Sequence, residues 1–180
     1  MKKEVYKLVC GGMCLALCLI LPFLTMQIPE IGQLLSPMHL PVFLCGFVCG
    51  WKYGLLVGFT APLLRSLLFG MPPLFPTAAS MAVELAVYGI MSAVLYARLP
   101  KKTISLYTAL IGAMIVGRVA GGAFQIFLLG FGYLDEFTLG MFVSSYFVQT
   151  LPGIICHILL VPPLVLVLRK MERIFPVKIS

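Results

Sequence analysis

The sequence predicts an all-α integral membrane protein: six transmembrane helices in a single compact bundle, with N- and C-termini cytoplasmic. Three observations predict it. The 180-residue chain is 61% hydrophobic and only 11% charged, with a mean hydropathy of +1.08, whereas soluble domains carry roughly 25% charged residues. Apolar runs long enough for a membrane helix recur along the chain. Lysines and arginines gather between alternate pairs of these runs, as the positive-inside rule requires.

The apolar runs place the six spans at about 6–27, 38–50, 53–70, 78–98, 104–130 and 141–168. The first run lacks the small-residue cleavage site of a signal peptide, so we expect a span there. The second is short for a crossing, which needs about 20 residues. A Trp51-Lys52 turn is expected after the second run, and the proline-rich loop Gly70 to Thr77 after the third. Without a linker or an internal repeat, residues 1–180 form a single membrane domain.

The basic residues predict the topology. Of the 13 lysines and arginines, all but Arg65 and Arg118 flank the spans, and six crossings put them on one side. The opposite loops, at 27–37, 71–77 and 131–140, contain Glu30, Asp135 and Glu136 but no basic residue. Both termini are therefore expected in the cytoplasm. The net charge of +7 is explained by this pattern and gives no indication of nucleic-acid binding.

All six cysteines lie inside apolar runs, where an exported disulfide would not form. Cys10, Cys14 and Cys18 are spaced four residues apart, as are Cys45 and Cys49, which is a helical spacing. No acidic residue or histidine flanks them as a further metal ligand. We expect these thiols to pack as small apolar side chains, with no metal and no cofactor.

Three charged residues fall inside the spans: Arg65, Glu84 and Arg118. A charge in lipid needs a partner or a polar cavity. Two interpretations are open: a buried arginine–glutamate pair that locks the bundle, or a cavity that opens outward. The sum of the three charges is +1, which favours a ligand with a negative group.

Other polar residues favour the cavity. Helical spacing puts Ser80, Glu84 and Tyr88 on one face, and Arg118 and Gln125 on another. His39 serves either as a polar cap or as a ligand contact, and His157 is expected in the core. The predicted ligand-binding residues are Arg65, Ser80, Glu84, Tyr88, Arg118, Gln125, Tyr146, Gln149 and His39.

Two further features concern partners and chemistry. Gly12 and Ala16 form a small-xxx-small pair, which from spacing alone favours packing within the molecule. The loop 27–37 is expected to fold back over the bundle as a lid.

No serine-hydrolase, zinc-protease or paired acidic motif occurs, so we expect no enzyme. Without a P-loop, ATP-driven transport requires another subunit.

The central block LSPMHLPVFLCGFVCGWKYGLLVGFTAPLLRSLLFGMPPLFPTAASMAVELAVYG has an apolar run ending in G-x-x-x-G, a second run with a polar outer end, and E-x-x-x-Y-G. With six spans and the small-residue pair, the chain resembles the substrate-binding S components of energy-coupling factor (ECF) transporters. The resemblance covers nearly the whole chain in layout.

This resemblance implies a subunit of a prokaryotic plasma membrane that captures a water-soluble vitamin or related micronutrient near the outer face. It also implies docking on a transmembrane T subunit and two ATPase subunits. An A-x-x-x-A motif in span one contacts the T subunit in that family; Gly12 and Ala16 match it, with glycine in place of one alanine. Docking then becomes the favoured role of this pair. The specific vitamin is not implied.

Two alternatives from other classes stay open. One is an intramembrane enzyme acting on a lipid or isoprenoid phosphate, with Glu84 as general base and an arginine that binds phosphate. The other is a non-catalytic membrane scaffold whose charges only lock helices.

Overall fold

The computed structural model describes residues 2–24, 34–100, 102–133 and 138–174, and within these ranges every regular element is helical. The expected all-α class is confirmed for this part of the chain. The elements are α1 (Lys2–Leu24), α3 (His39–Cys49), α4 (Trp51–Phe69), the π-helical turn η1 (Leu74–Ala78), α5 (Ala79–Arg98), α6 (Thr103–Gly130), α7 (Leu139–Val143), the π-helical turn η2 (Ser144–Val148) and α8 (Leu151–Ile174).

Four helical segments are long and apolar enough to cross a membrane: Glu4–Phe23, Leu74–Arg98, Thr103–Gly130 and Gly140–Lys170. They make this a multi-pass membrane protein by length and composition. The second predicted span is a helix of only 11 residues, His39–Cys49, and α4 is not among the four. All six predicted spans are helical, but six crossings and cytoplasmic termini stay predictions.

Two boundaries differ from those expected. The chain turns at Gly50, with φ of 93°, so Trp51 and Lys52 begin α4 and the predicted Trp51-Lys52 turn is wrong. Glycine adopts this positive φ without a Cβ clash, which is why the turn lies there. The sixth predicted span lies within the helical segment Gly140–Lys170, but this segment is divided into α7, η2 and α8, with the interruption just before Pro152.

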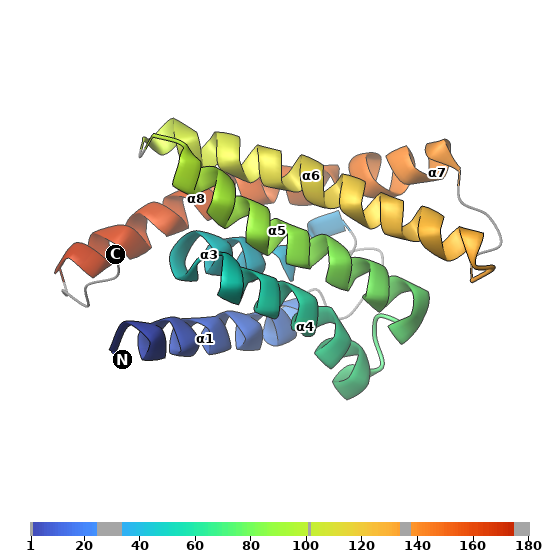
Figure 1. Ribbon diagram of the computed structural model, residues 1–180, viewed down its shortest axis with the longest axis horizontal. Coiled ribbons are helices and arrows are strands. Elements are labelled where there is room, and N and C mark those ends of the chain that lie inside the picture. Colours follow the sequence, from blue (N-terminus) through green and yellow to red (C-terminus); the bar gives the residue numbers. More distant parts are fainter. Residues whose placement is uncertain (1, 25–33, 101, 134–137, 175–180) are drawn as a thin grey trace.

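The helices lie in a bundle around α5, which packs along α4 on one side and α6 on the other (Figure 1). The short helix α3 contacts α1, α4, α5 and α8. The first residues of α1 and the last residues of α8 lie toward the same end of the bundle, at the left of Figure 1. This arrangement agrees with an even number of crossings.

Glycines allow the central helices to approach closely. A Cβ added at Gly54 of α4 would lie 2.6 Å from the carbonyl oxygen of Gly89 in α5, and one added at Gly46 of α3 would lie 2.7 Å from the same atom. Real Cβ atoms do not come so near a backbone oxygen. Small residues therefore set the distances between α3, α4 and α5, as is usual in membrane bundles.

The core and the outer surface are both apolar. Phe43, Leu110 and Val161 are fully buried, whereas Leu67, Ile104 and Leu159 are each more than 60% exposed. Exposed apolar side chains cover several helices, which suits a lipid solvent. Polar groups inside such a bundle need a specific reason to be there.

Candidate functional site

A cavity of about 450 Å³ lies between the helices at the end of the bundle opposite the first residues of α1. Its rim includes Pro22 near the end of α1, the segment 36–38 before α3, and the segment 71–73 after α4. The loop predicted as a lid falls mostly outside the described residues, because residues 25–33 are not described. Its last residues pack against α8, since a Cβ added at Gly153 would lie 2.7 Å from the carbonyl oxygen of Leu34.

Eight of the nine residues predicted to bind ligand line this cavity. They are His39, Arg65, Ser80, Glu84, Arg118, Gln125, Tyr146 and Gln149. The structure thus brings together side chains from α3, α4, α5, α6, η2 and the segment before α8. Ligand binding by these residues stays a prediction.

Tyr88 is the exception, because its side chain is 0% exposed and does not line the cavity. Its hydroxyl instead joins two residues that do. The Tyr88 hydroxyl donates a hydrogen bond to Glu84 Oε1, and Arg118 Nε donates one to the Tyr88 hydroxyl at 3.2 Å. Tyr88 therefore lies outside the cavity and positions Glu84 and Arg118, which line it.

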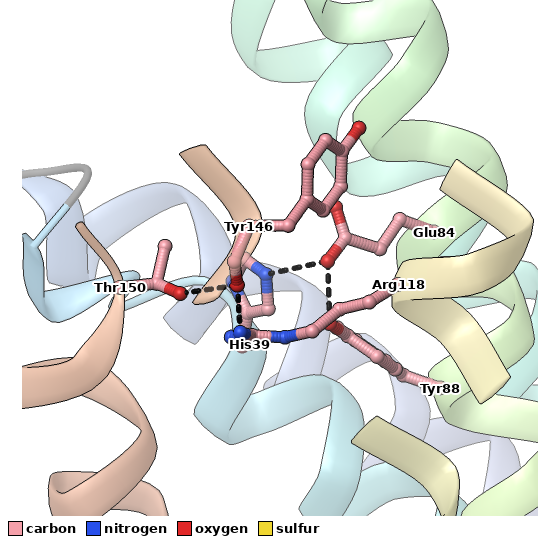
Figure 2. A network of polar contacts seen from close by, with 6 residues as sticks. All are labelled: His39, Glu84, Tyr88, Arg118, Tyr146 and Thr150. Atoms are coloured by element: carbon pink, nitrogen blue, oxygen red, sulfur yellow. Dashed lines mark hydrogen bonds and ion pairs between the residues drawn. The ribbon is translucent and has the colours of Figure 1, made fainter. Parts of the chain in front are cut away.

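Arg118 also closes a break in the last membrane segment (Figure 2). Its Nη1 donates a hydrogen bond to the carbonyl oxygen of Tyr146, and Thr150 Oγ1 donates to the same oxygen at 2.6 Å. The helix is interrupted here between η2 and α8, so this carbonyl is satisfied by side chains. The Arg118 guanidinium carbon lies 5.3 Å from the ring centroid of Phe147, a cation–π contact.

The arginine–glutamate pair, one of the two interpretations of the intramembrane charges, is not found as an ion pair among the described residues. The ion-pair contact of Glu84 in this part of the chain is with His39, whose Nε2 lies 3.9 Å from Oε1. Figure 2 shows His39 and Tyr88 both directed at the Glu84 carboxylate. In this part of the structure Glu84 and Arg118 are joined through the Tyr88 hydroxyl and not by a direct ion pair.

Arg65 has a different environment. It is 4% exposed, and its Nη1 donates to the carbonyl oxygen of Leu19 at 2.9 Å. Its guanidinium carbon lies 5.3 Å from the ring centroid of Phe23 and 5.5 Å from that of Phe69. These contacts hold the guanidinium where α1 and α4 meet at the cavity.

The two histidines lie together. His39 is 7% exposed, lines the cavity, and has a buried Nδ1 without a hydrogen-bond partner among the described residues. His157 is 2% exposed, with its ring centroid 5.8 Å from that of His39 and 5.9 Å from that of Phe43. His157 is thus a core residue, as expected, and His39 belongs to the cavity wall.

Sequence reasoning missed several lining residues. Thr77, Met81 and Thr150 lie one helical turn from predicted residues, so the same spacing argument could have found them. Ser145 in η2 lies four residues before Gln149 and could have been found in the same way. The remaining missed residues lie near the end of α1 or in segments between helices, where spacing is less informative: Pro22, Ser36, Pro37, Met38, Met71, Pro72 and Pro73.

The cysteines have a packing role. Cys18, Cys45 and Cys49 are buried in the core, and Cys10 and Cys14 pack against it. None of the six cysteines, all of which are among the described residues, forms a disulfide. The search of the described ranges found no group of three His, Cys, Asp or Glu residues arranged to hold a metal ion.

Gly12 and Ala16 lie on an exposed part of α1. A Cβ added at Gly12 would have no neighbour within 4 Å among the described residues. The pair therefore does not mediate close packing with the described part of the bundle, and its surface is open to another molecule or to lipid.

Comparison with known families decides the class of protein. The model of the family described as "ECF transporter, substrate-specific component" matches residues 6–165. The chain belongs to this family. No match was found among curated proteins or among solved structures. The matched range contains α1 to most of α8 and every predicted site residue.

As a substrate-specific component of an ECF transporter, the protein is a substrate-binding transport subunit, as its resemblance predicted. Membership also implies a small-molecule substrate and interaction with the T and ATPase modules of such a transporter.

Proposed function

We propose that this protein captures a small, water-soluble, vitamin-like micronutrient in the cavity between α3, α4, α5, α6 and η2. The cavity opens to the outside of a prokaryotic plasma membrane if both termini are cytoplasmic. The loaded subunit then docks on a T subunit and two ATPase subunits, which supply the energy that a chain without a P-loop cannot. No nucleic acid takes part.

One observation supports this proposal most strongly: polar side chains from several helices converge on one cavity of an otherwise apolar bundle. Burying a polar group without a partner costs roughly 1–3 kcal/mol by mutational measures. A bundle that needed only stability would replace such groups by apolar ones. The volume of about 450 Å³ lies in the usual range of ligand pockets.

Mass spectrometry of small molecules released from the purified, denatured protein tests capture directly. We expect a released compound that rebinds the ligand-free protein and raises its unfolding temperature. The proposal also requires that the protein copurify with an ATPase module when all subunits are expressed together. Failure of both measurements would leave the scaffold interpretation in place.

Glu84→Gln tests the site. It removes the carboxylate that accepts from Tyr88 and faces His39, so we expect affinity for the released compound to fall about tenfold or more, which corresponds to about 1.4 kcal/mol. Thr108→Ala is the matched control, because Thr108 is exposed on α6 and bonds only to its own helix among the described contacts. Unchanged affinity in Glu84→Gln contradicts the site assignment while leaving the family intact.

A further inference from the structure

Arg65 carries a charge for which the described part of the chain provides no counter-ion. It is buried and lines the cavity, yet no carboxylate of the described residues lies within ion-pair distance of it. One of its five N–H donors has an identified acceptor there, the carbonyl oxygen of Leu19. The flanking rings of Phe23 and Phe69 contribute cation–π attraction but accept no ion pair. A buried guanidinium in this position has capacity for an anion.

The other charges of the cavity are already engaged. Arg118 donates to the Tyr88 hydroxyl and to the Tyr146 carbonyl, where it joins η2 to α6. Glu84 accepts from Tyr88 and lies beside His39. Arg65 is therefore the cavity cation best placed to meet a negative group of a ligand.

His39 adds a second polar side chain to the cavity wall. Its Nε2 faces Glu84 Oε1 at 3.9 Å, and its Nδ1 is buried without a hydrogen-bond partner among the described residues. Because Nδ1 has almost no accessible surface, it gives no indication of a ligand contact.

We propose that the ligand of this cavity is an organic anion whose carboxylate or phosphate group pairs with Arg65. This inference rests on the proposed function and specifies its substrate class. Arginine suits the role because its planar fork binds both oxygens of a carboxylate or phosphate at once. This proposal gives each of the two arginines of the cavity a role: Arg118 bonds to Tyr88 and to the Tyr146 carbonyl, and Arg65 pairs with the ligand.

The test uses the full-length protein in detergent, freed of bound compounds, and a low-molecular-weight cell extract divided on an anion exchanger. We expect the retained, acidic fraction to raise the unfolding temperature of the wild type, and the unretained fraction to have no effect. In Arg65→Met the extract concentration that gives half the shift should rise at least tenfold. Arg65→Lys, which keeps the charge but not the fork, should lie between the two.

Arg98→Met is the matched control, because Arg98 is exposed at the end of α5 and lies outside the cavity; its response should equal that of the wild type. Phosphatase treatment of the acidic fraction separates the two sources of charge: loss of the shift identifies a phosphate ester, and retention identifies a carboxylate.

Two results would overturn the inference alone: stabilisation by the unretained fraction, or an equal response of Arg65→Met and the wild type to the acidic fraction. If neither fraction stabilises the wild type, the proposed function itself fails, and the inference fails with it.

Discussion

At the scale of single residues, the cavity wall depends on a few polar atoms with more than one partner. The Tyr88 hydroxyl accepts from Arg118 and donates to Glu84, although Tyr88 does not reach the cavity. The carbonyl oxygen of Tyr146 accepts from both Arg118 and Thr150. Removing one member of such a group takes a hydrogen bond from more than one buried atom, which costs more than one average hydrogen bond.

Arg118→Met should therefore destabilise the protein even without ligand. We expect a loss of about 1–3 kcal/mol, the usual cost of a buried polar group without its partner, because the Tyr88 hydroxyl and the Tyr146 carbonyl each lose a donor. Thermal unfolding of the ligand-free protein in detergent measures it. Arg98→Met, on the exposed end of α5, should unfold like the wild type. An unchanged unfolding temperature in Arg118→Met would show that the break before α8 does not need this side chain.

At the scale of elements, glycine contacts and one interruption position the cavity. Gly54 and Gly89 bring α4 against α5, which places Arg65 and Glu84 on neighbouring helices at one cavity. The interruption between η2 and α8 turns a carbonyl toward α6. Local geometry at these points decides which side chains face one another.

Gly54→Ala tests the helix contact. The added Cβ would lie 2.6 Å from the backbone oxygen of Gly89, so α4 and α5 must move apart. Overpacking of this kind costs about 1–3 kcal/mol, and we expect a lower unfolding temperature together with weaker ligand binding. Gly130→Ala is the control, because its Cβ would meet no described atom within 4 Å. Equal stability of the two variants would show that the contact at Gly54 tolerates a methyl group.

Gly12→Leu tests the docking surface on α1. The position is exposed, and an added Cβ has no described neighbour within 4 Å, so folding and ligand binding should be retained. If the T subunit approaches α1 here, a leucine side chain should strongly reduce copurification with the T and ATPase subunits. Ala123→Leu makes a similar change on the exposed face of α6 and should copurify normally. Normal copurification of Gly12→Leu would place the docking surface elsewhere.

At the scale of the whole molecule, the topology decides where the cavity opens. The first residues of α1 and the last of α8 share one end of the bundle (Figure 1). The residues that line the cavity lie toward the other end, beside Pro22 near the end of α1. The basic residues between the helices predict that the shared end is cytoplasmic. An outward-facing cavity follows from these two statements.

Reporter fusions test the orientation in cells. A fluorescent protein, which matures only in the cytoplasm, should be active when fused after Lys102 or Ser180. Alkaline phosphatase, which needs export, should be active when fused within the loops 71–77 or 131–140. The reverse pattern would turn the cavity toward the cytoplasm and remove the capture function as proposed.

The sequence by itself determined the membrane class, the helical segments, the family and the eight predicted residues that line the cavity. Hydrophobicity and charge placement are local properties, and helical spacing puts Ser80 beside Glu84 or Arg118 beside Gln125 without reference to any neighbour. Only the tertiary structure decided the pairing: Glu84 with His39 and Tyr88, Arg118 with the Tyr146 carbonyl, and Arg65 beside Phe23 and Phe69. These pairs depend on how each helix is rotated and where it breaks. The close contacts at Gly54 and Gly89 determine how α4 and α5 are rotated, and the interruption before Pro152 determines where the last segment breaks. The periodicity of a single helix does not predict either feature.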